Sequence, residues 1–390
     1  MIRAIAKNKF RFTVVPAGML AICLVAVLAI TGCNFFIGGY NSGNGGDLPI
    51  PPGPTSPDAV VKRLEKYLPR EAYEKIFDYR FGTDKWLTMA TNPVLIANRH
   101  DYYSYDNLKK AVYELAYLVY EIEFRTEPNG DTSHWNSRAF VTNKGTGKRT
   151  LVYEEAGFSQ DQNLNKPITT TRVDFGSFLG EGSENDRKRE IIALLANMTQ
   201  ETSGGNGHIP GDREKYGLFF NEEMGLEGST GANYVDPSNA QFPPAANRSY
   251  HGRGPIQLSW NYNYGLYSAI VFQDKNVLLQ APEKLVAKDG GGVLGFKSSI
   301  WFWMTPQAPK PSCHDVILST WKPNTVQAGA GWKPGFGATI MVINGGLEGG
   351  FAEGSDYRVN TRIGQYRRLA KETGANIAGE KVDTAGMSAL

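Results

Sequence analysis

The amino-acid sequence predicts a mainly helical domain that contains one small β segment. Several stretches place apolar residues at i, i+3, i+4 and i+7, which is the spacing of a helix with one buried face. The stretch 120–175 differs, because two strand-like runs, EIEFRT and RTLVYEE, flank the turn-forming sequences PNGD and KGTGK. With 390 residues, 41% of them apolar, the chain can form one large domain or two modest ones.

The clearest helix is expected at 183–202. Its apolar residues follow helical spacing from Ile191 onward, and Ser183 or Asn185 is placed to cap its first turn. Further helices are expected at 59–68, 67–81, 105–118, from Lys297 through the WFWM sequence, and at 357–373.

The N-terminal residues carry a targeting pattern. Four basic residues precede an apolar stretch from about residue 12 to residue 30, which ends in small residues just before Cys33. We interpret 1–32 as a lipoprotein signal peptide and Cys33 as the lipidated residue, with a plain membrane anchor as the alternative. The Gly-, Asn-, Ser- and Pro-rich segment 33–58 is predicted to be a flexible linker.

Charge and cysteine content exclude several classes of function. The formal net charge is +2 and no basic stripe is present, so a nucleic-acid partner is not expected. Of the three cysteines, only Cys313 lies beyond the signal peptide and the lipidation position, so no intramolecular disulfide is expected. Cys313 is predicted to be a small buried residue. The lack of a Cys/His cluster predicts no metal site.

The most informative segment runs from Ser249 to Met304. Glycines on both sides of Arg253 permit a close approach of the backbone to a ligand. Gln257, Ser259 and the sequence NYNYG then supply amides, hydroxyls and flat rings, which suit a saccharide. The alternative is a polar loop packed against the core.

Four blocks of sequence resemble the chitinases of glycoside hydrolase family 19, in that family's order. They are GRGPIQLSWNYNYG at 252–265, WFWMTPQAPKPSCHDVI at 301–317, VINGGLE at 342–348 and RIGQYRRL at 362–369. The resemblance implies a lysozyme-like bilobal helical domain with a deep cleft at 59–375. On this interpretation 120–175 is an insertion and 376–390 is a C-terminal tail.

Glycoside hydrolysis requires two carboxyl groups, and Glu201 is the first candidate. It lies on the apolar stripe of the helix expected at 183–202 and in its last turn. Partial burial and the negative end of the helix dipole both favour the protonated form that a general acid needs. The sequence ANMTQETSGG resembles the family's helix end that carries this acid, although Gln200 replaces a histidine and Asn206 a tryptophan.

The second carboxyl group lies in GLFFNEEMG, residues 217–225. Glu222 and Glu223 are adjacent, so only one of them points inward if the segment is extended. The residues alone leave both open, and the resemblance selects Glu223 as the general base.

The resemblance also implies roles for residues around the two carboxylates. Ser259 would help Glu223 to hold the attacking water, and Asn263 would contact the N-acetyl group of the sugar. Glu348 and Arg362 would form a charged network that tunes Glu223. The remaining substrate-binding positions are Gln257, Tyr262, Lys297, Asn344 and Arg362.

These observations predict an endo-acting chitinase that cleaves β-1,4-linked N-acetylglucosamine polymers with inversion. Its partners would be chitin or chitooligosaccharides, with no metal or organic cofactor, and a monomer is expected. The signal sequence implies export and a lipid anchor at a bacterial envelope, at the outer membrane or the cell surface. The alternatives are a peptidoglycan hydrolase of the same fold and a non-catalytic chitin-binding protein.

Overall fold

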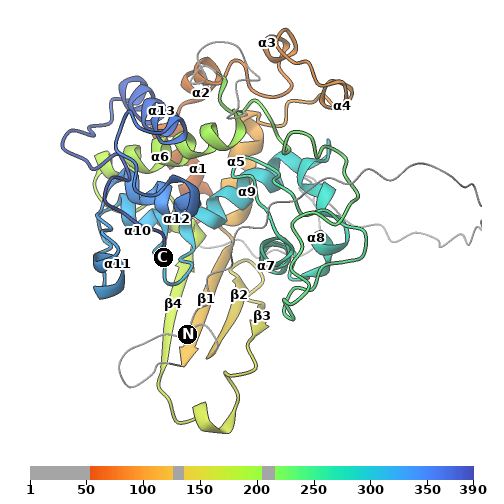
Figure 1. Cartoon of the computed structure of the whole chain (residues 1–390), viewed down its shortest axis with the longest axis vertical. Coiled ribbons are helices and arrows are strands. Elements are labelled where there is room, and N and C mark those ends of the chain that lie inside the picture. Colours follow the sequence, from red (N-terminus) through yellow and green to blue (C-terminus); the bar gives the residue numbers. More distant parts are fainter. Residues whose placement is uncertain (1–52, 126–135, 204–215) are drawn as a thin grey trace, which may run out of the picture. The chain divides into compact units, whose positions relative to one another are not determined.

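The computed structural model describes residues 53–125, 136–203 and 216–390, and Figure 1 shows the course of the chain through them. The expected signal peptide, Cys33 and most of the expected linker lie outside the described residues. The described residues form a mainly helical body with a four-stranded sheet, which confirms the fold class predicted from the sequence. Among the described helices, none combines the length and the apolarity needed to cross a bilayer.

The first helices begin at polar caps or at prolines. The Ser56 hydroxyl accepts a hydrogen bond from the Ala59 N–H (3.3 Å) at the start of α1. The helix expected at 67–81 is shorter than predicted and covers only the seven residues of α2. Pro69 cannot donate the hydrogen bond that would continue α1, so α2 begins after it. The helices of this region are α1 (Pro57–Tyr67), α2 (Arg70–Ile76), α3 (Asp84–Leu87), α4 (Pro93–Ala97) and α5 (Tyr105–Leu115).

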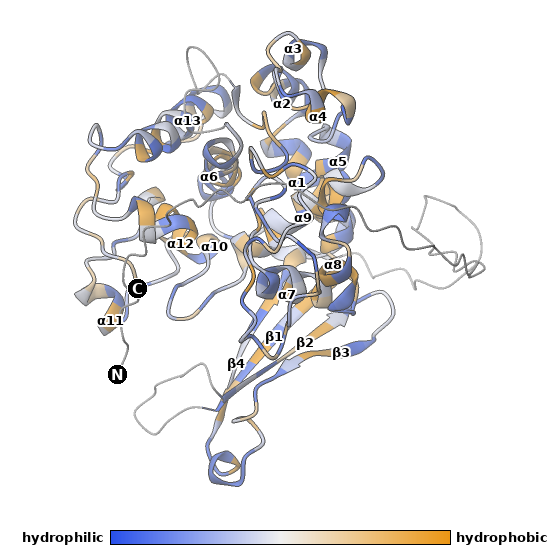
Figure 2. Cartoon of the chain, turned by 45° about the vertical axis from the view of Figure 1, so that its right-hand side comes forward, coloured by the Kyte–Doolittle hydropathy of each residue, from blue (hydrophilic) through white to orange (hydrophobic). Residues whose placement is uncertain are grey.

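The expected β segment forms an antiparallel sheet with the strand order β3-β2-β1-β4. The helix expected at 105–118 ends at Leu115, and Leu118 begins the first strand. Figure 2 shows apolar and polar residues alternating along β1 and β2, where Tyr120 pairs with Val141 and both are buried. The strands are β1 (Leu118–Arg125), β2 (Ser137–Asn143), β3 (Arg149–Glu154) and β4 (Ile168–Asp174).

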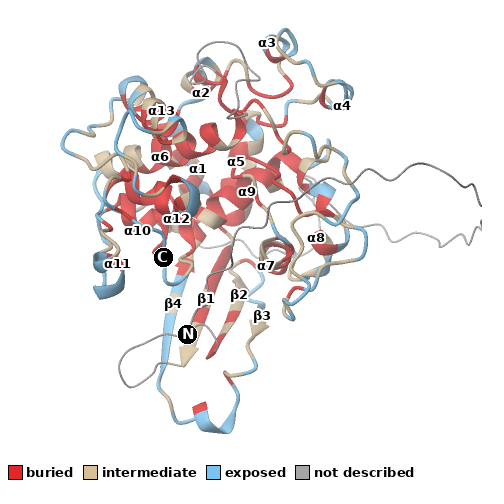
Figure 3. Cartoon of the chain, viewed as in Figure 1, coloured by how far each residue is buried: buried red, intermediate tan, exposed pale blue. Residues whose placement is uncertain are grey.

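Helix α6 (Glu184–Thr202) lies at the centre of the helical body. Ser183 and Asp186 form a capping box, in which each side chain accepts a hydrogen bond from the backbone N–H of the other. All residues from Glu190 to Gln200 are buried, so α6 is surrounded rather than amphipathic along this stretch. Figure 3 shows this buried region in red, together with much of α5 and of α9 (Gly291–Met304).

The C-terminal half supplies the helices that cover α6. α13 packs along α6, while α9 and α12 contact it from other sides. Trp301 and Trp303 of α9 are each 1% exposed, so they belong to the core rather than to a sugar-binding platform. The remaining helices are α7 (Asn261–Val271), α8 (Asn276–Gln280), α10 (Cys313–Ile317), α11 (Thr325–Gly329), α12 (Phe336–Glu348) and α13 (Tyr357–Thr373).

The C-terminal segment 376–390 packs against the helical body. The Thr384 hydroxyl donates a hydrogen bond to the carbonyl of Glu348 (2.6 Å), the last residue of α12. The Trp332 indole N–H donates to the carbonyl of Ser388 (2.8 Å). This segment therefore holds the end of α12 in place.

Candidate active site

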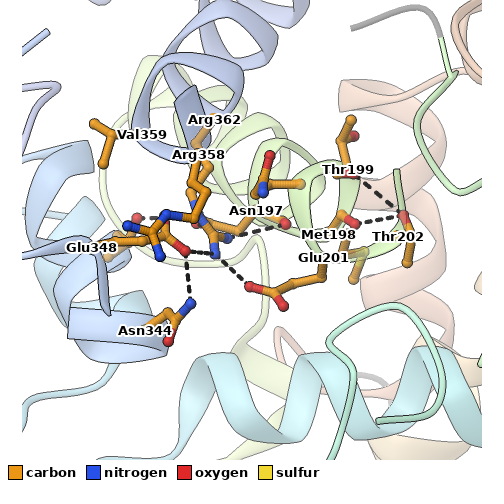
Figure 4. Close-up of polar contacts among 12 residues, drawn as sticks. Asn197, Met198, Thr199, Glu201, Thr202, Asn344, Glu348, Arg358, Val359 and Arg362 are labelled. Atoms are coloured by element: carbon orange, nitrogen blue, oxygen red, sulfur yellow. Dashed lines mark hydrogen bonds and ion pairs between the residues drawn. The ribbon is translucent and has the colours of Figure 1, made fainter. Parts of the chain in front are cut away.

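Glu201 occupies the last turn of α6 and is the first of the two predicted carboxylates. Its side chain is 17% exposed and forms an ion pair with Arg362 of α13. Figure 4 shows the Glu201 carboxylate pointing from α6 toward the Arg362 guanidinium. The packing of α13 against α6 thus brings together two residues that are far apart in the sequence.

Arg362 is fully buried and bonded on several sides. Its guanidinium donates two hydrogen bonds to Glu348, both at 2.8 Å. It also donates to the side-chain oxygen of Asn197 (3.0 Å) and to the carbonyl of the same residue (3.2 Å). The Asn344 amide donates to Glu348 (2.7 Å) from a point where α12 leaves helical geometry. The cation is therefore shared between two carboxylates.

The three charged groups differ in their proton affinity. Burial raises the pKa of Glu201, and the nearby Glu348 adds to this effect, while Arg362 opposes it; the pKa remains above its ordinary value. Burial also acts to raise the pKa of Glu348, but Arg362 and Asn344 outweigh it and the pKa is lowered. Glu348 thus stays ionised as the counter-charge of Arg362, and Glu201 is the group that can hold a proton.

The adjacent carboxylates of Glu222 and Glu223 have different surroundings. Glu222 is buried, and its Oε1 accepts hydrogen bonds from His251 (2.7 Å) and from Arg253 (2.9 Å). Burial acts to raise the pKa of Glu222, but His251 and Arg253 prevail and lower it. Glu222 is therefore occupied by a buried ion pair, so the geometry favours Glu223 as the base.

Glu223 is partly exposed, and both of its carboxylate oxygens are held. Oε1 accepts a hydrogen bond from the Tyr234 hydroxyl (2.7 Å), and Oε2 accepts one from the Gly252 N–H (3.0 Å). The Glu223 N–H in turn donates to the Gly252 carbonyl (2.8 Å). Backbone and side chain together fix the carboxylate against the predicted saccharide segment.

Backbone hydrogen bonds connect the regions of the two carboxylates. The N–H of Phe220 donates to the carbonyl of Thr202 (2.9 Å), the last residue of α6. The N–H of Leu218 donates to the Thr202 hydroxyl (2.9 Å). The segment that carries Glu223 is therefore bonded to the end of the helix that carries Glu201.

Four predicted substrate-binding residues lie together at the start of α7. The Ser259 hydroxyl donates to the Gln257 carbonyl (2.9 Å), and the Asn263 amide donates to the Ser259 carbonyl (2.9 Å). The Tyr262 ring stacks on Trp260, with 6.0 Å between centroids and 14° between planes. Within the described part of the chain, Ser259 shares no hydrogen bond with Glu223.

An aromatic chain connects this group to the second carboxylate. Trp260 is 39% exposed, and its ring contacts Tyr234 edge-on, with 5.5 Å between centroids. Tyr234 is the residue that donates to Glu223. The residues at the start of α7 are therefore connected to the carboxylate of Glu223 through the rings of Trp260 and Tyr234.

The other predicted positions join a different partner than expected. Glu348 and Arg362 lie beside Glu201, whereas the resemblance implied that they form a network that tunes Glu223. Asn344, a predicted substrate-binding residue, donates to Glu348 of the same group. The reason is that α13 packs on α6. Lys297 of α9 joins neither carboxylate; it is largely buried and pairs with Glu114 of α5 (3.1 Å).

Sequence analysis did not identify Asn197 or Tyr234. Asn197 lies four residues before Glu201 on the same helix, so the i, i+4 rule could have indicated that both share one face. Tyr234 lies in an irregular loop, where no periodic signal exists.

The residues that the structure describes contain no candidate set of metal ligands. No group of three or more His, Cys, Asp or Glu side chains that could hold a metal ion occurs in 53–125, 136–203 or 216–390. Cys313 is buried, its thiol donates to the Thr339 carbonyl (3.8 Å), and burial raises its pKa. A buried thiol with a raised pKa is a poor nucleophile, in agreement with the structural role predicted for Cys313.

Comparison with known proteins places this site in a family. The family model described as chitinase class I, of glycoside hydrolase family 19, matches residues 158–384. The chain belongs to glycoside hydrolase family 19. The match contains Glu201, Glu223 and all the predicted substrate-binding residues, and it begins inside the segment 120–175. Family 19 membership agrees with the lysozyme-like, mainly helical fold predicted from the sequence.

Two plant members of family 19 illustrate the extent of the similarity. Chitinase 9 of Oryza sativa subsp. japonica is 45% identical over 207 residues, which are 53% of this chain and 58% of that protein. Endochitinase 2 of Solanum tuberosum is 47% identical over 211 residues, which are 53% of this chain and 62% of that protein. The chain thus matches less than two thirds of the length of these relatives.

Among solved structures, chitinase C from Streptomyces griseus is similar with a TM-score of 0.46 and 21% identity. The alignment covers 82% of this chain and 80% of that chain.

Proposed function

We propose that this chain is an endo-acting chitinase that hydrolyses β-1,4 linkages between N-acetylglucosamine units with inversion. Membership of family 19 supports the reaction class. The observation that carries the proposal is that Glu201 and Glu223 have different surroundings, while backbone hydrogen bonds connect the chain segments that hold them. The pKa of Glu201 is raised, and the charge of the neighbouring Arg362 is balanced by Glu348. Glu223 instead accepts hydrogen bonds from Tyr234 and from the Gly252 N–H.

In the proposed reaction Glu201 donates its proton to the glycosidic oxygen. Glu223 removes a proton from a water molecule, which attacks the anomeric carbon from the opposite face. Tyr234 and the Gly252 N–H orient Glu223, because they hold both of its oxygens. The half-buried amides and rings at the start of α7 would bind the sugar and position it.

Hydrolysis of chitin hexaose, followed by NMR of the anomeric protons, tests this proposal. We expect α-anomeric products and internal cleavage. Glu201→Gln and Glu223→Gln should each lower kcat by about 10²-fold or more, while the hexaose still binds. Glu372→Gln, which alters an exposed carboxylate on α13, is the control and should leave kcat unchanged. β-anomeric products, or turnover of purified peptidoglycan without turnover of the hexaose, would contradict the proposal.

We also propose that 59–375 is the catalytic domain, with 120–175 as an insertion, and that the protein is exported. A lipid on Cys33 would hold it at a bacterial envelope, at the outer membrane or the cell surface, where it would act as a monomer. The basic, apolar and small residues before Cys33 support the lipid anchor. Cys33→Ser should move the protein from the detergent phase to the aqueous phase after Triton X-114 partition. Unchanged partition would contradict lipidation, and light scattering of the released protein would test the monomer.

A further inference from the structure

A row of buried hydrogen bonds begins at Glu222, the residue that precedes Glu223. Glu222 Oε1 accepts from His251 Nε2 (2.7 Å), and Nδ1 of the same ring lies 2.6 Å from the Ser249 hydroxyl. The Ser249 hydroxyl accepts in turn from the side-chain amide of Asn233 (3.2 Å). We call these four residues the His251 network. His251 is 0% exposed and Ser249 is 1% exposed, so bulk water does not compete for these hydrogen bonds.

Every polar group at the centre of the His251 network has a partner. A carboxylate can only accept, so Nε2 of His251 is the donor to Glu222. The Ser249 hydroxyl accepts from Asn233 and can donate its own proton to Nδ1 of His251. A buried polar network that is satisfied in this way fixes the positions of its members.

The residues that form the contacts of the Glu223 carboxylate each directly follow a member of this network in the sequence. The pairs are Glu222 with Glu223, His251 with Gly252, and Asn233 with Tyr234. The contacts themselves are the hydrogen bonds that Glu223 accepts from the Tyr234 hydroxyl (2.7 Å) and from the Gly252 N–H (3.0 Å). Because a planar peptide bond joins the residues of each pair, a shift of the network also shifts these contacts.

The backbone of Tyr234 adds a second reason to expect support from behind. Its φ is +54°, in the left-handed region that a tyrosine rarely adopts. Such a conformation persists only where the surroundings hold it. The side chain of Asn233 donates to Ser249 and also to Ser229 (3.0 Å), and its carbonyl accepts from the Tyr250 N–H (3.0 Å). The residue before Tyr234 is therefore held on both its side chain and its backbone.

We propose that His251 is a positioning residue for the general base. It connects the residue before Glu223 to the residue before Tyr234, and so fixes the carboxylate relative to the hydroxyl that orients it. Stability alone does not require such a network, because apolar residues of similar volume often stabilise a fold as well as buried ionic groups do. The inference rests on the proposed function in so far as it takes Glu223 as the base.

The first test compares His251→Phe with the wild-type chain in the hydrolysis of chitin hexaose. Phenylalanine fills a similar volume but forms none of the hydrogen bonds of the imidazole, so Glu223 loses its fixed position. We expect kcat to fall about tenfold and KM to change by about twofold or less, since the sugar-binding residues at the start of α7 are unchanged. His251→Gln, whose amide can still donate to Glu222, should recover most of the lost kcat.

A milder variant and a matched control accompany this test. Ser249→Ala interrupts the same network with a small change in volume, so it replaces His251→Phe if that variant does not fold, and it should lower kcat about threefold. Ser268→Ala removes another fully buried serine hydroxyl, which bonds the Asp274 carbonyl (2.7 Å) and the Leu278 N–H (3.1 Å). It should leave kcat unchanged.

The double variant distinguishes positioning of Glu223 from a merely structural role. If His251 acts through the carboxylate, then His251→Phe in a Glu223→Gln background should lower kcat by about twofold or less. A tenfold loss in both backgrounds would overturn the inference, as would an unchanged kcat in a folded His251→Phe variant.

Crystal structures of the wild-type chain and of His251→Phe separate this inference from the proposed function. We expect the variant to lose the hydrogen bond between the Tyr234 hydroxyl and Glu223. If the wild-type chain fails to hydrolyse chitin hexaose and the variant still loses this bond, the proposed function fails and the positioning of Glu223 by His251 stands. If hexaose is hydrolysed and the variant keeps the bond, the inference alone fails.

Discussion

At the scale of single residues, the position of Arg362 decides which carboxylate can act as an acid. Its guanidinium contacts both Glu201 and Glu348, and each alone would lose much of its proton affinity beside a buried cation. Glu348 makes two of the contacts and also accepts from Asn344, so it holds the negative charge. Glu201 is left with one contact and a raised pKa.

We predict that Glu348→Gln moves the alkaline limb of the kcat/KM–pH profile to lower pH, by about one pH unit. A general acid works only when protonated, so activity falls above its pKa. The negative charge of Glu348 raises the pKa of Glu201, and its removal lets Arg362 lower that pKa. Hydrolysis of a soluble oligosaccharide across the acidic, neutral and alkaline range measures the limb. Glu353→Gln, at an exposed ion pair with Arg367, should not move it, and an unmoved limb in Glu348→Gln would exclude the coupling.

The adjacent residues Glu222 and Glu223 differ in burial and in their partners, which separates a structural carboxylate from the proposed general base. We predict that Glu222→Gln lowers the free energy of unfolding by about 3 kcal/mol, because it leaves Arg253, which is 2% exposed, without its carboxylate partner. Glu223→Gln should lower it by about 1 kcal/mol or less, since its site is partly exposed. Urea unfolding of both variants measures the contrast. Equal losses would show that Glu222 is not the structural member of the pair.

At the scale of elements, a buried network joins three helices behind the site. Glu190 of α6 accepts hydrogen bonds from the Trp303 indole of α9 (3.2 Å) and from the Leu179 N–H (3.0 Å). It also pairs with His314 of α10, which reaches toward Glu181 as well. Burial alone would lower the pKa of His314, but the two carboxylates outweigh it and raise the pKa to about 10.

We predict that this network makes the stability of the protein fall as the pH rises from 6.5 to about 10. The folded pKa of His314 lies above its ordinary value of 6.5, so its contribution is complete below that value and is lost as the pH passes the folded pKa. Each unit by which the pKa in the folded state exceeds the pKa in the unfolded state corresponds to about 1.4 kcal/mol of unfolding free energy. Chemical unfolding at about pH 6 and about pH 10 should therefore show a much larger deficit for His314→Gln at the lower pH. A deficit that does not change with pH would mean that the ring is neutral in the native state.

The periodicity of the sequence predicted where helices lie better than it predicted which side chains meet between them. The apolar spacing after Ile191 identified α6, because a buried helix face leaves a pattern in its own residues. The contact of Arg362 with Glu201 left no such pattern, since it depends on how α13 packs across α6. Pro69 was visible in the sequence, yet the resemblance of 67–81 to the family's opening helix placed the helix start before it, and α2 begins only after it.

At the scale of the whole described body, the site and the sheet are separate structures. The hydrogen-bond partners of Glu201, Glu223 and Arg362 lie on helices α6, α12 and α13, in the loop that holds Tyr234 and at Gly252. Within the described residues none of them lies on β1–β4. The sheet contacts the body elsewhere: β3 packs against α7, and the Thr150 hydroxyl donates to Gln273 (3.0 Å). The sheet therefore supports α7 from outside.

We predict that replacing 121–172 by a short Gly-Ser turn gives a folded protein that keeps most of its kcat on chitin hexaose and melts several degrees lower. The join is feasible because Tyr120 and Val173 are paired neighbours on β1 and β4, about 5 Å apart. Stability falls because apolar residues such as Ile122 and Val141 leave the core and α7 loses its cover. Circular dichroism melts and hexaose turnover of the shortened chain measure both effects. A shortened chain that folds with an unchanged helical spectrum but has lost its kcat would place the sheet in the catalytic machinery and contradict this prediction.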